Sequence, residues 1–349
     1  DTTFIDVRAP IEFDQGHVPG ALNRPLMTDD ERHKVGLCYK QQGQKAAVAL
    51  GHKLVSGEVK AQRVHAWLEA ASQPEKTVLY CARGGMRSSI SQGWMSAAGL
   101  DLPLVQGGYK TLRHTLLEQN QRFSDSADLI VVAGRTGSGK TKVIEAASNA
   151  IDLEALANHR GSAFGRHTSA QPSQANFENA VAMASLRLDT NKPVVIEDES
   201  RNIGSVHLGQ RLAERIKNTA VVMLEVSLEE RVEVILEDYV IALQAEYQQQ
   251  FGVEGFARYR DYMAGALQRV SRRLGGLLYQ RVQHELESAL QLQNTTGSLA
   301  GHRAWIESLL HHYYDRMYDY QLQKAPRDIL FSGGRSEVID FLNQRQNGN

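Results

Sequence analysis

The chain has 349 residues, of which 42% are hydrophobic and 23% charged, a composition that excludes the disordered and fibrous classes of protein. A chain of this length usually exceeds one hydrophobic core, so we expect two domains. No apolar run reaches the roughly 18 residues that a membrane span needs, and no signal-peptide pattern opens the chain. We therefore expect a cytoplasmic protein with no membrane partner, and no obligate protein partner is evident.

The net charge of −1 hides an uneven distribution of charge along the chain. Lys and Arg counted against Asp and Glu give −4 for residues 1–30, +7 for 31–170 and −4 for 171–349. The basic middle region spans two glycine-rich turns and so predicts an anionic ligand, with chance clustering on a solvated face as the alternative. The two cysteines, Cys38 and Cys81, are too few for a disulfide framework and lack metal-ligand spacing, which favours reduced thiols.

In chain order, the first part of the sequence alternates strands and helices. A strand at "TFIDV", a short helix and the turn "GHVPG" come first, followed by a helix at "VHAWLEAAS" and a buried strand at "TVLYC". A helix at "SSISQGWMSAAGL" comes next, and then a strand, a double-glycine turn and a helix at "LPLVQGGYKTLRHTLL". This alternation predicts a parallel sheet, whose ligands bind beyond the carboxyl ends of the strands, where Cys81 lies.

Cys81 stands between this buried strand and the loop "ARGGM". The two glycines let the backbone curl so that amide groups point at the sulfur, the helix that begins near Ser88 adds its positive end, and Arg83 and Arg87 add full charges. Each effect favours thiolate over thiol, so we predict a lowered pKa and a reactive nucleophile. The alternative is a buried structural cysteine, which is our interpretation of Cys38.

The motifs "IDVRAPIEF", "GHVPGALNRP", "CARGGMRS" and "VQGGYKTLR" resemble the successive landmarks of a rhodanese domain over about 120 residues. The resemblance implies that Cys81 is the catalytic cysteine and that Asp6 and Arg8 form a structural pair that holds its loop. The segment "DDERHKVGLCYKQQGQKAAVALGHKL" interrupts the usual spacing of these motifs, and an ordinary sulfurtransferase would not need it.

A second glycine turn lies in "DLIVVAGRTGSGKTKVIEAA", between a predicted strand and a predicted helix. It matches the pattern G-x-x-x-x-G-K-[ST], in which backbone amides wrap a phosphate, the lysine adds a cation and the last hydroxyl can hold Mg²⁺. The residues assigned here to phosphate or diphosphate binding are Gly134, Thr136, Gly137, Ser138, Gly139, Lys140 and Thr141. For the acid that Mg²⁺ requires beside Thr141, we choose Asp198 in "PVVIEDES" over Glu197 and Glu199; the alternative is that these acids cap the following turn.

Beyond this point, "VVMLEVSLEERVEVILEDYV" predicts a strand and a helix, residues 238–325 are mostly helical, and "DILFSGGRSEVIDFLNQ" predicts a last strand and helix. The tyrosines of "LLHHYYDRMYDYQLQK" favour core packing, with stacking on bases as the alternative. The predicted fold class is α/β. A rhodanese-like parallel-sheet domain occupies residues 1–124, and a P-loop NTPase-like α/β domain with a helical C-terminal part occupies 125–349.

Across nearly its whole length the chain resembles the tRNA 2-selenouridine synthase family, through "NRPLMTDDERHKVGLCYKQQG", "ALGHKL", "GRTGSGKT", "DLEALANHRGSAFG", "QPSQANFENA", "IEDESRNIG" and "YYDRMYDYQL". The resemblance implies a tRNA substrate with 2-thiouridine at the wobble position of the anticodon loop, a selenophosphate donor, and a geranyl diphosphate donor for an S-geranylated intermediate. It also implies a role at the rhodanese site for Gly51, for which a helix-ending glycine is the alternative.

This chemistry is coherent, because alkylation of the thiouridine sulfur turns it into a thiol leaving group and makes C2 more electrophilic. We expect the phosphate loop to hold geranyl diphosphate rather than ATP, and Cys81 either to carry selenium to C2 or to attack C2 and be displaced by selenide. Arg160 and Arg166 in "ANHRGSAFGRH" are expected to bind diphosphate or the tRNA backbone, with a solvated loop as the alternative. Rival functions are a sulfurtransferase fused to a regulatory nucleotide-binding P-loop domain, and a binding module whose P-loop anchors a nucleotide.

Overall fold

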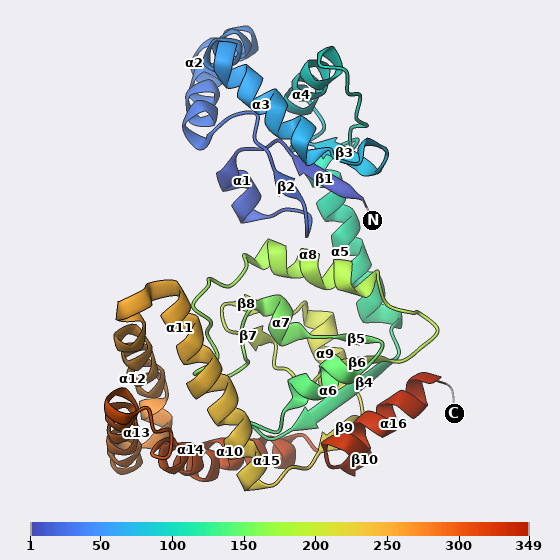
Figure 1. Ribbon diagram of the computed structural model, residues 1–349. Coiled ribbons are helices and arrows are strands. Elements are labelled where there is room, and N and C mark those ends of the chain that lie inside the picture. The colour runs from blue at the N-terminus through green and yellow to red at the C-terminus, as the bar shows by residue number, and fades with distance from the viewer. Residues whose placement is uncertain (1, 348–349) are drawn as a thin grey trace. The chain divides into compact units, whose positions relative to one another are not determined.

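The computed structural model describes residues 2–347 (Figure 1). They form two compact units whose division does not follow the order of the chain. The first unit runs to Gln121 and also includes Ser173–Leu186, while the second consists of Arg122–Pro172 and the chain from Arg187 onwards. The expected boundary after residue 124 assigned Ser173–Leu186 to the second domain, whereas the structure packs this segment with the first.

The first unit is built on a parallel sheet with the strand order β2-β1-β3. Its strands are β1 Thr3–Asp6, β2 Leu22–Asn23 and β3 Thr77–Tyr80. Ile5 on β1 and Leu79 on β3 are fully buried and pack with Trp67 and Met95 in one hydrophobic cluster. The predicted strands "TFIDV" and "TVLYC" are thus confirmed, whereas the strand predicted around Leu104 is reduced to a single bridge with Leu79.

The helices of this unit include two that were not predicted from the sequence, α2 and α8. They are α1 Pro10–Gln15, α2 Asp29–Leu54, α3 Gly57–Ala70, the 3-10 turn η1 Pro74–Lys76, α4 Met86–Ala97, α5 Gly108–Ser126 and α8 Gln174–Ser185. Helix α2 occupies the segment that interrupts the rhodanese-like spacing, and it begins with a capping box between Thr28 and Glu31. It bends at Gly43, whose φ of 82° belongs to the left-handed region. The insertion therefore consists of two helical arms joined at a glycine.

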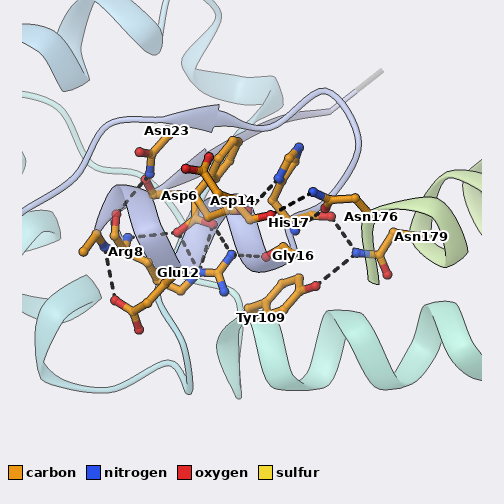
Figure 2. Close-up of polar contacts among 12 residues, drawn as sticks. Asp6, Arg8, Glu12, Asp14, Gly16, His17, Asn23, Tyr109, Asn176 and Asn179 are labelled. Carbon is orange, nitrogen blue, oxygen red and sulfur yellow. Dashed lines mark hydrogen bonds and ion pairs between the residues drawn. The ribbon is translucent and has the colours of Figure 1, made fainter. Parts of the chain in front are cut away.

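Helix α8 joins the first unit through its asparagine side chains, as Figure 2 shows. The carboxamide oxygen of Asn176 accepts a hydrogen bond from the backbone N–H of His17 at 2.8 Å. The amide nitrogen of the fully buried Asn179 donates to the carbonyl of His17 at 2.6 Å and to the hydroxyl of Tyr109 at 3.1 Å. Arg113 in turn donates to the Asn179 oxygen at 2.6 Å. The motif "QPSQANFENA" therefore has a structural role in the rhodanese-like unit.

The second unit contains a five-stranded parallel sheet with the order β10-β9-β4-β6-β5. The strands are β4 Leu129–Gly134, β5 Ala150–Ile151, β6 Val194–Glu197, β9 Val221–Leu224 and β10 Ile329–Gly333, with β7 Asn202–Ile203 and β8 Val206–His207 forming a separate antiparallel hairpin. Strand β4 is buried along its whole length, as expected where both faces of a parallel sheet are covered. Because β4 and β6 are parallel neighbours, their ends Gly134 and Glu197 lie at the same edge of the sheet.

The rest of the second unit is mostly helical, which confirms the prediction for residues 238–325. Its helices are α6 Lys140–Ala146, α7 Leu153–Ala157, α9 Gln210–Asn218, α10 Leu228–Ile235, the π-helical turn η2 Leu236–Ala242, α11 Leu243–Phe251, the 3-10 turn η3 Gly252–Glu254, α12 Gly255–Leu274, α13 Gly276–Thr296, α14 His302–Leu309, the π-helical turn η4 Leu310–Tyr314, α15 Asp315–Lys324 and α16 Arg335–Asn347. Strand β10 and helix α16 confirm the final strand and helix.

The tyrosine-rich segment contributes mainly to the core of the helical part. Tyr313 and Tyr314 are 7% and 9% exposed and belong to the hydrophobic cluster that includes Tyr259 and Leu310. For these two tyrosines core packing is confirmed, whereas Tyr320 is 63% exposed. Within residues 2–347, no helix combines the length and the apolar content that crossing a bilayer requires.

Replacing Asn179 by alanine is expected to destabilise the full chain by about 2–3 kcal/mol, because it leaves the His17 carbonyl and the Tyr109 hydroxyl without this donor. The free energy of unfolding in urea measures the effect. The matched control is Asn218→Ala at the exposed end of α9, where a change below about 0.5 kcal/mol is expected. Equal stability of the two variants would contradict a structural role for α8 in the first unit.

Candidate functional site

Cys81 follows β3 directly and precedes α4, past the carboxyl end of a parallel strand as predicted. Only 3% of its surface is exposed. Its Sγ lies 3.2 Å from the hydroxyl oxygen of Ser88 and 3.8 Å from the carbonyl oxygen of Gly85. The thiol is therefore buried beneath its loop, within hydrogen-bond distance of the first turn of α4.

Hydrogen bonds lower the pKa of the Cys81 thiol. Burial is the largest single effect and raises the pKa, but the Ser88 hydroxyl and the backbone amides of Arg83, Ser88 and Gly85 together outweigh it. The pKa therefore lies below its usual value, in the direction that the sequence analysis predicted. That a reactive nucleophile results remains a prediction.

Of the two arginines in the loop, Arg87 has a carboxylate partner of its own. The guanidinium of Arg87 donates to both carboxylate oxygens of Glu12, at 2.6 and 3.0 Å, and Arg83 is exposed. Burial raises the pKa of Glu12, but its hydrogen bonds to Arg87 and the charges of Arg87 and Arg32 together outweigh burial. The pKa of Glu12 is therefore lowered, and the carboxyl group stays ionised. Arg87 thus ties α4 to α1, and the hydrogen bonds around the sulfur, rather than its charge, account for the lowered pKa of Cys81.

The double-glycine turn at Gly107 and Gly108 contacts the backbone of the Cys81 loop. The backbone N–H of Tyr109 donates to the carbonyl of Cys81 at 2.8 Å. Gly108 has a φ of 59°, and a Cβ placed on it would lie 2.2 Å from that carbonyl oxygen and 2.5 Å from the amide nitrogen of Gly84. Only glycine permits two backbones to approach this closely, which explains the double glycine of "VQGGYK".

Asp6 and Arg8 form the structural pair that the rhodanese resemblance implied (Figure 2). The guanidinium of Arg8 donates to the Asp6 carboxylate at 2.6 to 3.0 Å and to the carbonyl of Gly16 at 2.7 Å. Its carbon Cζ also lies 4.0 Å from the ring centroid of Tyr109, the residue that follows the double-glycine turn. The buried pair therefore braces the turn that supports the Cys81 loop.

Gly51 and Arg87 both line a cavity of about 720 Å³ in the first unit. Gly51 belongs to the second arm of α2, and Arg87 to the first turn of α4. Neither Cys81 nor Arg83 belongs to this wall. The candidate residues of the first unit therefore separate into the thiol loop and an adjoining cavity.

In the second unit, β4, the loop after it and α6 form the predicted phosphate loop. Gly137 and Gly139 both have a φ of 79°. A Cβ on Gly137 would lie 2.9 Å from the side chain of Ile235, so this position also needs glycine for space. The motif residues assigned from the sequence, Gly134, Thr136, Gly137, Ser138, Gly139, Lys140 and Thr141, all line one cavity of about 540 Å³.

Arg160 and Asp198 line the same cavity, whereas Arg166 is exposed and outside it. Arg160 donates to Glu246 at 3.1 Å, and its Nη1 has no hydrogen-bond partner among the described residues, which leaves a donor for an anion. Asp198 is held by Arg327, whose Nη1 lies 2.5 Å from its carboxylate. The structure thus brings one of the two predicted arginines to the phosphate loop.

Two glutamates, Glu154 and Glu199, line the cavity together with Lys140. Burial, followed by the negative charge of Glu154, raises the pKa of Glu199 to about 8. Burial also raises the pKa of Glu154 and, well above its usual value, that of the 1% exposed Glu197. Glu199 is therefore largely protonated at neutral pH, so the cavity carries less negative charge than its composition indicates.

The donor set beside the phosphate loop fits a Mg²⁺ ion that takes most of its ligands from phosphate and water. Thr141 offers a hydroxyl and Asp198 a carboxylate, both on the cavity wall. Within residues 2–347, no group of three or more His, Cys, Asp or Glu side chains could cage a metal by itself. Binding through one or two protein side chains, with the remaining ligands from phosphate and water, is usual for Mg²⁺ next to a phosphorylated substrate.

The fold and the two sites define an α/β protein that joins a rhodanese-like thiol loop to a P-loop unit with a helical C-terminal part. Models of known families agree with this class: a Rhodanese-like domain matches residues 1–115, and the tRNA 2-selenouridine synthase AAA domain matches residues 127–349. A Marinobacter nauticus protein called tRNA 2-selenouridine synthase is 45% identical over 99% of this chain and 95% of its own length. One of the same name from Alcanivorax borkumensis is 46% identical over 99% and 96%. The chain belongs to the tRNA 2-selenouridine synthase family.

Sequence reasoning missed several residues at the two sites. Ser88 was named only as the start of a helix, and Glu12 was not connected with Arg87. Glu154 was also missed, although it stands in the quoted motif "DLEALANHRGSAFG". The double glycine of "VQGGYK" was a signal that could have revealed Gly108, because adjacent glycines at a turn often mark a close approach of two backbones.

Replacing Ser88 by alanine is expected to raise the pKa of Cys81, because the hydroxyl favours the thiolate. The pH dependence of iodoacetamide alkylation at Cys81, followed by peptide mass spectrometry, should shift its midpoint to higher pH. Ser89→Ala is the matched control, since the Ser89 hydroxyl donates to the Gly85 carbonyl and not to the thiol. If Ser88→Ala keeps the midpoint of the unmodified protein, the hydroxyl does not stabilise the thiolate.

Glu199 is expected to make the folded protein less stable as pH rises. Its pKa in the folded protein is about 8, against 4.5 for an ordinary glutamate, so the folded state holds the proton more tightly than the unfolded state. Stability is therefore unaffected below pH 4.5 and declines as pH approaches 8. The stability advantage of Glu199→Gln over the unmodified protein should therefore increase by about 1 kcal/mol or more as the pH is raised from 5 to 9. Urea unfolding at both pH values measures this gain, with Glu214→Gln at an exposed position of α9 as the control; a gain that does not change with pH refutes the assignment.

Proposed function

We propose that this protein is a cytoplasmic tRNA-modifying transferase that converts 2-thiouridine at the wobble position to 2-selenouridine. In this proposal the base passes through S-geranyl-2-thiouridine, with geranyl diphosphate and selenophosphate as co-substrates. The observation that carries the proposal is the presence, in one chain of the tRNA 2-selenouridine synthase family, of a hydrogen-bonded thiol loop and a phosphate loop. Alkylation and selenium transfer need these two kinds of site.

The first step takes place at the phosphate loop. The thiouridine sulfur attacks C1 of the geranyl group, the C1–O bond breaks, and diphosphate leaves with the electron pair while the base loses its N3 proton. Lys140 and the loop amides stabilise the charge on the departing diphosphate, and Arg160 adds a donor. Thr141 and Asp198 would hold Mg²⁺, which supplies further neutralisation of that charge when it is bound. The protonated carboxyl of Glu199 avoids a repulsion that a carboxylate would cause.

The second step takes place at Cys81. Its thiolate attacks C2 of the alkylated base, and geranyl thiolate leaves and takes up a proton. The selenium of selenophosphate then displaces Cys81 from C2, and hydrolysis of the P–Se bond releases phosphate and 2-selenouridine. No atom changes its oxidation state in this sequence.

Electron counting favours this route over the one in which Cys81 carries selenium. Selenium in selenophosphate is at the oxidation level of selenide, so joining it to a thiolate sulfur requires removal of two electrons. Neither co-substrate is an oxidant. Displacement at C2 needs none, and the lowered pKa of Cys81 makes its thiolate available both as nucleophile and as leaving group.

Separate variants are expected to block the two steps. Cys81→Ser should accumulate S-geranyl-2-thiouridine and lose selenation by at least about a hundredfold, because the thiolate is missing. Lys140→Ala should lower the geranylation of 2-thiouridine by a similar factor. It should still convert RNA that already carries the S-geranyl group to 2-selenouridine. Nucleoside analysis by mass spectrometry measures all three bases.

Cys38→Ser and Lys217→Ala, which lie in α2 and α9, are the matched controls and should modify tRNA normally. Geranylation by Lys140→Ala at the normal rate, or strict dependence of the reaction on ATP hydrolysis, would contradict the proposal. Sulfur transfer without any change in tRNA would support the fused sulfurtransferase instead.

A further inference from the structure

The cavity of about 720 Å³ in the first unit lies among the two arms of α2, helix α4 and the segment before α2. Its volume falls within the range of about 300–1,000 Å³ that small-molecule pockets usually have. The wall is mainly apolar, and its members include Met27, Val35, Val48, Met86, Ile90 and Trp94. Helix α2 supplies much of this wall, so the segment that interrupts the rhodanese-like spacing helps to form the cavity.

Three of the charged side chains that line the cavity, Glu12, Arg32 and Arg87, are paired with each other, and the fourth, Lys40, is exposed. The Glu12 carboxylate is bound by Arg87 at 2.6 Å and by Arg32 at 3.0 Å. Both guanidinium groups are therefore engaged, and they are poorly placed to recognise a phosphate. An apolar group suits this cavity better than an anion does.

The cavity borders the loop that carries the thiol. In the first turn of α4, Met86 and Arg87 line the cavity, and the next residue, Ser88, lies 3.2 Å from the Cys81 sulfur. Leu26 and Val55 on the cavity wall belong to the same hydrophobic cluster as Cys81. A ligand that fills the cavity would therefore end next to the Cys81 loop.

The reactants that Cys81 handles differ greatly in polarity. Selenophosphate and the ribose phosphates of RNA are hydrophilic and gain nothing from an apolar wall. The chain on the sulfur of the alkylated base is a branched hydrocarbon, and burying each of its methylene groups favours binding by about fourfold. Of these groups, only the hydrocarbon chain matches the lining.

We propose that this cavity binds the geranyl chain of S-geranyl-2-thiouridine and thereby presents C2 of the base to Cys81. The inference rests on the proposed function and adds to it a binding site for the leaving group. Binding of the chain in the α2–α4 cavity selects the alkylated base over 2-thiouridine, because the latter has nothing to place there. The binding energy of a remote group is thus used at the reacting carbon.

The test uses the full-length protein, selenophosphate and two preformed anticodon stem-loop RNAs, one with S-geranyl-2-thiouridine and one with S-methyl-2-thiouridine. Geranyl diphosphate is omitted, so the phosphate loop is not needed. The unmodified protein should selenate the geranyl RNA with a kcat/KM at least tenfold above that for the methyl RNA. Val48→Trp, which fills the cavity, should lower kcat/KM at least tenfold for the geranyl RNA and leave the methyl RNA unchanged.

Val59→Trp is the matched control, because Val59 is 37% exposed on α3 and outside the cavity wall. It should change neither rate. Val35→Trp, on the other arm of α2, should reproduce the loss that is specific to the geranyl RNA, which guards against a single misfolded variant. Circular dichroism and urea unfolding confirm that each variant is folded.

Two results would overturn the inference alone: equal kcat/KM for both RNAs with the unmodified protein, or folded Val48→Trp and Val35→Trp variants that treat the two RNAs as the unmodified protein does. Absence of selenation with either RNA would overturn the proposed function and this inference with it. The two failures are therefore distinguishable, since the first leaves turnover intact and the second abolishes it.

Discussion

The close approach of two glycine backbones is the constraint on which the thiol loop depends. Gly108 comes so near the Cys81 carbonyl that a Cβ would overlap with it, and the Tyr109 amide bonds to the same carbonyl. The loop is therefore held from its backbone side, and the sulfur is left to interact with Ser88 and the surrounding amides. Arg8 stacks on Tyr109 and so connects this support to the buried Asp6.

The two sites manage charge in opposite ways. Around Cys81, hydrogen bonds favour the anion against the effect of burial, and Arg87 is paired with Glu12. Around the phosphate loop, burial raises the pKa of Glu199 and Glu154, which reduces the negative charge in the cavity that they share with Lys140. One site is suited to generate a small nucleophilic anion and the other to receive a large one.

Two parts of the chain adapt the rhodanese-like unit beyond the common motifs. Helix α2 bends at Gly43 and encloses an apolar cavity next to the thiol loop. Helix α8, which lies within the sequence of the second unit, packs into the first through Asn176 and Asn179. Sequence motifs that a generic sulfurtransferase lacks thus correspond to structure that a small inorganic substrate would not require.

By itself the sequence determined the α/β class, the phosphate loop and the position of Cys81 after a strand, because each depends on contiguous residues whose local backbone pattern is distinctive. The Asp6–Arg8 pair followed from the resemblance to the rhodanese family. Only the tertiary structure decided the partners of the charged side chains. Arg87 binds Glu12 across 75 positions of sequence, and Arg327 binds Asp198 across 129, so neither pairing leaves a local pattern. The same reason applies to α8 and to the cavity formed by α2 and α4: such contacts depend on how distant segments pack, which residue spacing does not encode.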